Sequence, residues 1–175
     1  MNPFSFQFWV LIFTVITVLS AAVYDYRTRL IPNVITFTAI LAGLLVHGWR
    51  NGWNGLSFSL LGLAVGGGLL LIFYLLGGMG AGDVKLLAGV GALIGAEKVF
   101  AVFVLTAIAG GLMAIGQMMR HSTLKNIFRR RKNFLHEFFY KEHFSFDDKI
   151  ADPLKNTLPY GVAIAIGALA AFITQ

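Results

Sequence analysis

Two aspartates, Asp25 and Asp83, lie at the ends of long apolar segments, where an ionisable side chain is unusual. Outside residues 119–157 the sequence contains one further acid, Glu97, next to Lys98 in a short polar interruption. Ionisable residues in membrane segments are costly and by default functional. Two carboxylates that meet in a partly dry site share a proton, so that one can activate water while the other polarises a carbonyl group. The pair therefore predicts a site suited to peptide hydrolysis, provided that the fold brings the two side chains together.

The residues around the two aspartates favour an irregular backbone. Four glycines stand in the six residues 77–82, directly before Asp83. Glycine allows unusual backbone angles and the close approach of another chain, so an extended substrate strand could lie beside this segment. Small residues also allow close packing of helices, which is the structural alternative. After Asp25, Pro32 and Asn33 suit a sharp turn and the start of a helix.

A purely structural role would also explain the two aspartates. Each carboxylate could cap the end of a helix or pair with a nearby cation, of which Arg27, Arg29 and Lys85 are the candidates. The spacing alone leaves the structural and the catalytic interpretation open.

The elements that must position these residues are membrane helices. Hydrophobic residues make up 57% of the chain and charged residues 13%, and the mean hydropathy is +0.75, which excludes an ordinary soluble domain. The segments apolar enough to span a bilayer are 5–24, 33–49, 55–76, 79–96, 99–119 and 158–174. We therefore expect an all-α polytopic integral membrane protein, one domain over residues 1–175, with six transmembrane helices. A five-span protein with a re-entrant glycine-rich segment is the alternative.

Positive charge is concentrated in one loop: residues 119–157 hold nine of the 14 Lys and Arg residues. With six spans this loop lies on the same side as Asp25 and Asp83, and its charge makes that side cytoplasmic, with both termini outside. Phenylalanines recur in the loop near a helical period, which predicts an amphipathic helix on the anionic inner leaflet. A nucleic-acid site would not need these phenylalanines, so we expect no nucleic-acid partner.

Two motifs together resemble those of the type IV prepilin peptidases, which are membrane-embedded aspartyl proteases of the GxGD type. The residues of the first motif are Asp25, Arg29, Ile31, Pro32 and Asn33, and those of the second are Gly80, Gly82, Asp83, Val84 and Lys85. A third element, Pro159-Tyr160-Gly161, resembles the Pro-Tyr-Gly of the small tight-adherence (Flp) pilus branch. With the six-helix layout, the resemblance covers essentially the whole chain.

The resemblance implies an aspartic endopeptidase of the inner membrane with Asp25 and Asp83 as its catalytic dyad. The substrate would be a prepilin, whose hydrophobic helix lies in the membrane and whose short basic leader, ending in glycine, is removed on the cytoplasmic side. The residues implied to bind substrate or shape the site are Gly80, Gly82, Lys85, Arg29, Pro32 and Asn33. Lys85 and Arg29 are equally explained as charges that orient the protein in the membrane.

The resemblance implies no cofactor and no metal. The cysteine-containing region that methylates the new N-terminus in larger family members has no counterpart in this sequence, which contains no cysteine. We therefore expect no N-methyltransferase activity. Among the histidines, His47 fits a packing role, and His121, His136 and His143 are too loosely spaced for a metal site.

Two other functions stay open. A small proton-coupled transporter could use Asp25 and Asp83 as proton carriers, but it predicts acids near the midplane of the membrane and an inverted repeat. A non-catalytic subunit of a pilus or secretion assembly could dock through the basic loop. Such a subunit would tolerate Asp→Asn at both positions, whereas a protease would not.

Overall fold

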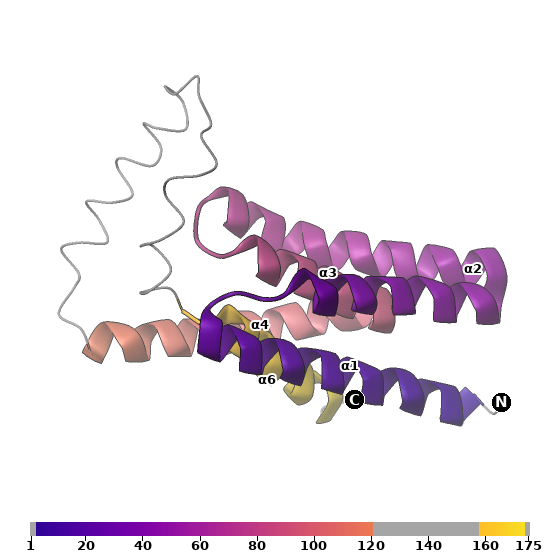
Figure 1. Ribbon diagram of the computed structural model, residues 1–175, viewed down its shortest axis with the longest axis horizontal. Helices are drawn as coiled ribbons and strands as arrows, with labels where there is room; N and C mark the ends of the chain where they lie inside the picture. Colours follow the sequence, from indigo (N-terminus) through magenta and orange to yellow (C-terminus); the bar gives the residue numbers. More distant parts are fainter. Residues whose placement is uncertain (1–2, 121–157, 174–175) are drawn as a thin grey trace, which may run out of the picture. The chain divides into compact units, whose positions relative to one another are not determined.

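The structure is a computed structural model that describes residues 3–120 and 158–173 (Figure 1). Within these ranges the regular elements are helices, and no strand occurs. The helices are α1 (Pro3–Thr28), α2 (Asn33–Leu75), α3 (Ala81–Ile94), α4 (Ala96–Arg120) and α6 (Tyr160–Ile173). The expected all-α class is thereby confirmed for the described residues. The expected amphipathic helix of the basic loop falls in residues 121–157, which lie outside them.

Three of the described helices are long and apolar enough to cross a membrane: Ser5–Thr28, Asn33–Leu75 and Ala96–Gln117. Helices α3 and α6 contain 14 residues each. That length corresponds to about 21 Å of helix, which is less than the ~30 Å of a hydrocarbon core. The described helices therefore fit an integral membrane protein, while the six-span layout stays a prediction.

Glycines at both ends make α3 shorter than the expected helix over residues 79–96. Gly80 has extended backbone angles, φ −82° and ψ 153°, and so precedes the first helical residue. Gly95 has φ 86°, a left-handed conformation that residues with a side chain rarely adopt, and it ends the helix. Because α4 begins directly afterwards, Glu97 and Lys98 lie in the first turn of a helix rather than in a connecting turn.

Gly52 divides α2 into two arms, residues 33–51 and 53–75, which correspond to the expected helices 33–49 and 55–76. Its angles, φ 55° and ψ −132°, are non-helical and suit glycine. The arms fold back on each other, since a Cβ placed on Gly55 would lie 2.6 Å from the carbonyl carbon of His47. Figure 1 shows the two arms side by side, running in opposite directions.

Helix α3 packs against both arms of α2 through small residues that let the backbones touch. On the second arm, Gly62 faces Gly91, and a Cβ added to either glycine would collide with the carbonyl oxygen of the other. On the first arm, a Cβ added to Gly43 would lie 2.6 Å from the carbonyl oxygen of Ala92. Ser59 donates a hydrogen bond of 2.7 Å to the same oxygen. Close packing and hydrogen bonds of this kind hold helices together in lipid, where apolar burial contributes little.

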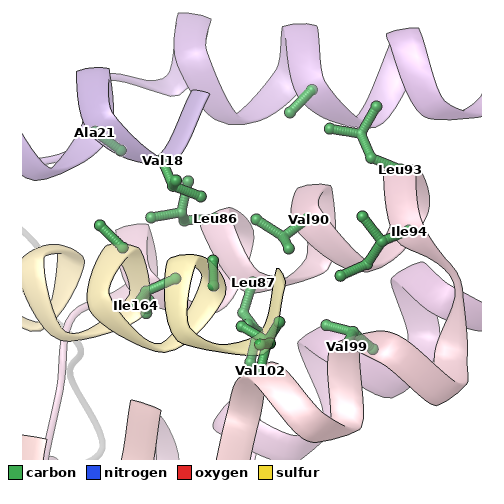
Figure 2. Packing of buried hydrophobic residues seen from close by; sticks show 14 of the residues in the cluster. Val18, Ala21, Leu86, Leu87, Val90, Leu93, Ile94, Val99, Val102 and Ile164 are labelled. Carbon is green, nitrogen blue, oxygen red and sulfur yellow. The ribbon is translucent and has the colours of Figure 1, made fainter. Parts of the chain in front are cut away.

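Helix α3 also supplies the centre of the apolar core, where Leu86 and Leu87 are fully buried (Figure 2). Around these two residues lie Val18 of α1, Val102 of α4 and Ile164 of α6, which have no exposed area either. Because α3 is enclosed by its neighbours, the position of its first turn, which carries Asp83, is fixed by the packing of the whole helix.

The chain divides into two compact units. The first contains Met1–Gly110 and Pro159–Gln175, and the second contains Gly111–Leu158. All features described below belong to the first unit. Of the second unit, the structure describes only residues 111–120 and 158, so the expectation of a single domain stays a prediction.

Candidate active site

The ends of four helices meet around the two aspartates. Asp25 lies three residues before the end of α1, and Asp83 lies in the first turn of α3. Gly161, in the first turn of α6, donates its backbone N–H to Asp25. Lys85 of α3 donates from Nζ to Oδ1 of Asn33, the first residue of α2, at 3.0 Å. The fold thus brings together residues that are up to 136 positions apart in the sequence.

Asp25 is held by the start of α6. Its side chain is only 6% exposed, and its Oδ2 accepts the N–H of Gly161 at 2.7 Å. The first amides of a helix have no acceptor within the helix, so the carboxylate supplies the missing partner. Gly161 has to be glycine for this contact, because a Cβ at that position would lie 2.9 Å from both Cβ and Oδ2 of Asp25.

Asp83 is held by its own helix start. Its side chain is 7% exposed, and its Oδ2 accepts the backbone N–H of Gly80 at 3.1 Å. In return, the N–H of Asp83 donates to the carbonyl oxygen of Gly80 at 3.2 Å. This reciprocal pair is a capping arrangement that satisfies two backbone groups at the start of α3.

Each aspartate therefore has the capping role that the structural interpretation predicted, but this role uses one oxygen only. Both hydrogen bonds go to Oδ2, which leaves Oδ1 of each carboxylate without a hydrogen bond to the described residues. The carboxylates of Asp25 and Asp83 also interact electrostatically with each other, and Arg29 interacts with Asp25. The structure thus places two buried acids within reach of each other's charge, and Oδ1 of each accepts no hydrogen bond from the described residues.

Arg29 and Pro32 shape the chain between α1 and α2. Arg29 donates its N–H to the carbonyl oxygen of Asp25 at 2.9 Å and has φ 57°. That left-handed angle is uncommon for a residue with a side chain and ends α1 sharply. Pro32 follows with extended angles, φ −60° and ψ 134°, and its carbonyl oxygen accepts the N–H of Ile35 at 3.1 Å. These two residues form the turn that leads from α1 into α2.

The two predicted site glycines, Gly80 and Gly82, differ in how closely other residues approach them. A Cβ on Gly82 would lie 3.1 Å from Cβ of Ile31, so glycine there allows close contact between the two motifs. A Cβ on Gly80 would meet Oδ2 of Asp83 at 3.4 Å, an ordinary contact, and the extended angles of Gly80 suit any residue. The need for close approach therefore applies to Gly82 and not to Gly80.

Lys85 and Asn33 join the two helix starts at the surface. Besides its hydrogen bond to Asn33, the Lys85 ammonium lies 5.6 Å from the ring centroid of Phe37, within the range of a cation–π interaction. Lys85 thus ties α3 to the first arm of α2 beside the buried acids. This position agrees with both predicted roles, site shaping and membrane orientation.

Gly161 contacts Asp25 in the candidate site, although the expected site residues do not include it. Its Pro159-Tyr160-Gly161 motif is visible in the sequence, but nothing local in the sequence shows that the Gly161 N–H meets Asp25. The described residues contain no group of three or more His, Cys, Asp and Glu side chains that could hold a metal ion. His47 is buried away from the aspartates, and its Nε2 lies 2.8 Å from the carbonyl oxygen of Leu93.

With this geometry in view, comparisons with known proteins define the class. Residues 12–115, more than half of the chain, match the type IV leader peptidase family, and the chain therefore belongs to this family. The matched range includes both aspartates and ends before the Pro159-Tyr160-Gly161 element.

Two similar proteins are both named prepilin leader peptidase/N-methyltransferase. The Escherichia coli K12 protein is 29% identical over 118 residues, which cover 63% of this chain and 52% of the relative. The Burkholderia pseudomallei 1026b protein is 33% identical over 105 residues, which cover 55% of this chain and 33% of the relative. The match thus spans about half the length of the first relative and a third of the second. No solved structure gives a significant match.

Proposed function

We propose that this chain is an intramembrane aspartic endopeptidase that removes the leader peptide from type IV prepilins, with Asp25 and Asp83 as its catalytic pair. One observation carries the proposal: in a member of the type IV leader peptidase family, two buried carboxylates from α1 and α3 interact at one end of the helices. Oδ1 of each carboxylate accepts no hydrogen bond from the described residues.

The proposed mechanism uses the pair as general base and general acid. The ionised carboxylate takes a proton from water, which attacks the scissile carbonyl carbon. The protonated carboxylate hydrogen-bonds to the carbonyl oxygen and stabilises the tetrahedral intermediate. Its proton then passes to the leaving amine, which leaves the pair with the single proton it began with. The N–H groups of Gly161 and Gly80 fix Oδ2 of each acid, so that Oδ1 faces the chemistry.

The proposed orientation places the aspartates at the cytoplasmic face. Arg27, Arg29 and Lys85 belong to the helix ends that meet there. Arg50 lies at the far end of the first arm of α2, and Lys98 lies in the first turn of α4, just after the far end of α3. This distribution, together with the basic loop, follows the positive-inside pattern for a protein with six spans and both termini outside. A prepilin leader in the cytoplasm would then reach the pair directly.

The finer parts of the proposal rest on sequence. The Pro159-Tyr160-Gly161 element supports a Flp-like prepilin as substrate, and the amphipathic pattern of residues 119–157 supports contact with anionic lipids rather than nucleic acid. The lack of an N-methyltransferase activity stays a prediction, as does the lack of a cofactor. A transporter is disfavoured because both acids lie at helix ends rather than along a helix.

Cleavage in membranes tests the proposal. A Flp-like precursor would be co-expressed with the wild type, with Asp25→Asn or with Asp83→Asn, and the product followed by gel shift and N-terminal sequencing. We expect cleavage after the leader glycine by the wild type and intact precursor with either variant at equal expression. Asp152→Asn, which makes the same chemical change elsewhere, serves as the matched control and should cleave normally. Normal cleavage by either aspartate variant would show that this aspartate is structural and that the proposed mechanism is wrong, whereas no cleavage by the wild type would support the non-catalytic assembly subunit.

A further inference from the structure

An apolar groove opens at the end of the helices that is away from the two aspartates. It lies between the first half of α1 and the last turns of the first arm of α2, and its volume is about 1180 Å³. The large side chains in its walls are Phe6, Trp9, Phe13, Leu45 and Trp49. Trp9 and Trp49 are 60% and 94% exposed, as is typical of aromatic residues at a membrane–water interface.

A polar pocket of about 470 Å³ adjoins this groove and shares Phe6, Val10, Arg50 and Leu93 with it. The charged residues that line it are Arg50, Glu97 and Lys98. In the described part of the chain, none of these three charged groups forms an ion pair or a hydrogen bond. The Arg50 guanidinium lies only over the ring of Phe6, 4.0 Å from its centroid. Arg50 thus stands where the polar pocket meets the apolar groove, and a second cation, Lys98, lines the polar pocket itself.

This combination matches an amphiphile whose anionic head and apolar tails lie next to each other. A purely apolar ligand would fill the groove but leave the cations unpaired. A small anion would pair with the cations but leave the groove empty. We propose that the two cavities bind one membrane phospholipid, with its phosphate at Arg50 and Lys98 and its acyl chains in the groove. In the topology proposed above, this lipid belongs to the outer leaflet.

Native mass spectrometry of the delipidated full chain in detergent tests the proposal with three probes. Dioleoyl phosphatidylglycerol carries both the phosphate and the chains, dioleoylglycerol lacks the phosphate, and glycerol 3-phosphate lacks the chains. We expect a saturable one-to-one complex with the first probe, weaker binding of the second and none of the third. Equal binding of the first two probes would contradict the role of the cations.

Variants distinguish binding at this site from non-specific association of lipid with the protein surface. Arg50→Ala and Lys98→Ala should each weaken phosphatidylglycerol binding about fivefold, because a basic residue near a membrane surface contributes about that factor. Arg27→Ala, at the other end of α1, is the matched control and should bind as the wild type does. Ala42→Phe, which fills the groove, should abolish the complex, whereas Ala107→Phe on the exposed face of α4 should not.

Other occupants of the groove give different results. If a prepilin helix or a second copy of this chain occupied it, Ala42→Phe would reduce precursor capture or dimer formation and leave lipid binding unchanged. Either result, or an equal effect of Ala42→Phe and Ala107→Phe on lipid binding, would overturn the proposal. The readout is lipid binding rather than cleavage, so it is independent of the proposed protease activity.

Discussion

The charged side chains at the two ends of the helical unit differ in burial and in hydrogen bonding. At one end, Asp25 and Asp83 are buried, and each carboxylate accepts a backbone N–H at a helix start. At the other end, Arg50 and Lys98 are exposed and form no ion pair within the described structure. A buried charge without partners is costly, whereas an exposed one is not. This difference is why we propose a reaction at the aspartate end and a bound ligand at the opposite end.

The largest expected effect is at the aspartate end. Asp25→Asn and Asp83→Asn should each lower the initial rate of prepilin cleavage by about 10²–10⁴-fold, the usual contribution of a general acid or base. An amide keeps the shape of the side chain and its ability to accept the Gly161 or Gly80 N–H, so the fold should persist. Initial rates in solubilised membranes, with thermal unfolding measured in parallel, check this prediction. A rate loss accompanied by an equal loss of folded protein would point to the capping role alone.

Gly161→Ala should lower the cleavage rate although it leaves both aspartates in the sequence. The new Cβ would lie 2.9 Å from Cβ and Oδ2 of Asp25, so the side chain must move. A displacement of about 1 Å at a catalytic group can cost about 10²-fold in rate. Gly68→Ala is the matched control, because a Cβ there meets no atom within 4 Å. If Gly161→Ala cleaved as fast as Gly68→Ala, the contact with Asp25 would not position a catalytic group.

The packing that joins the two ends predicts a smaller effect, on stability. Gly62→Ala would push its methyl group into the carbonyl oxygen of Gly91, which should destabilise the helices by about 1–3 kcal/mol. Gly68→Ala on the same arm should be neutral or slightly stabilising, because alanine favours the helix over glycine. Unfolding in detergent measures both variants. Equal stability would show that α3 can shift away from the second arm without cost.

The smallest expected effect is at the surface of the aspartate end. Lys85 and Asn33 share one exposed hydrogen bond, which should show a coupling energy of about 0.6 kcal/mol in a double-mutant cycle. Lys85→Met and Asn33→Ala, alone and combined, supply the cycle, with unfolding as the readout. A coupling near zero would assign Lys85 to membrane orientation rather than to joining α2 and α3.

The sequence predicted the helical class, and it marked the two aspartates as candidates, because both inferences depend on local signals. Hydropathy marks membrane helices whatever their packing, and an acid beside an apolar segment is conspicuous. The break in α2 was also visible, since the polar residues around Gly52 interrupt the apolar run. The shorter α3 was not, because hydropathy does not register the backbone angles of Gly80 and Gly95 that fix its ends.

Contacts between distant segments lay beyond prediction from the sequence. The Gly161 N–H meets Asp25 only because α6 packs beside α1. The contacts of Gly62 with Gly91 and of Ser59 with Ala92 depend on how the arms of α2 enclose α3. Small residues were expected to matter in the segment 77–82, yet the closest backbone contacts lie deeper, along α3 itself. Tertiary packing, rather than local preference, decides such pairs.

The most direct test of the central claim, that Asp25 and Asp83 act as one catalytic pair, is the initial cleavage rate of the double variant Asp25→Asn/Asp83→Asn. Residues that act as a unit are strongly non-additive, since removing one already removes the function of both. We predict that the double variant cleaves a radiolabelled prepilin as slowly as the slower single variant, and no slower. A rate reduced by the product of the two single effects would show that the aspartates act independently and would contradict the proposed mechanism.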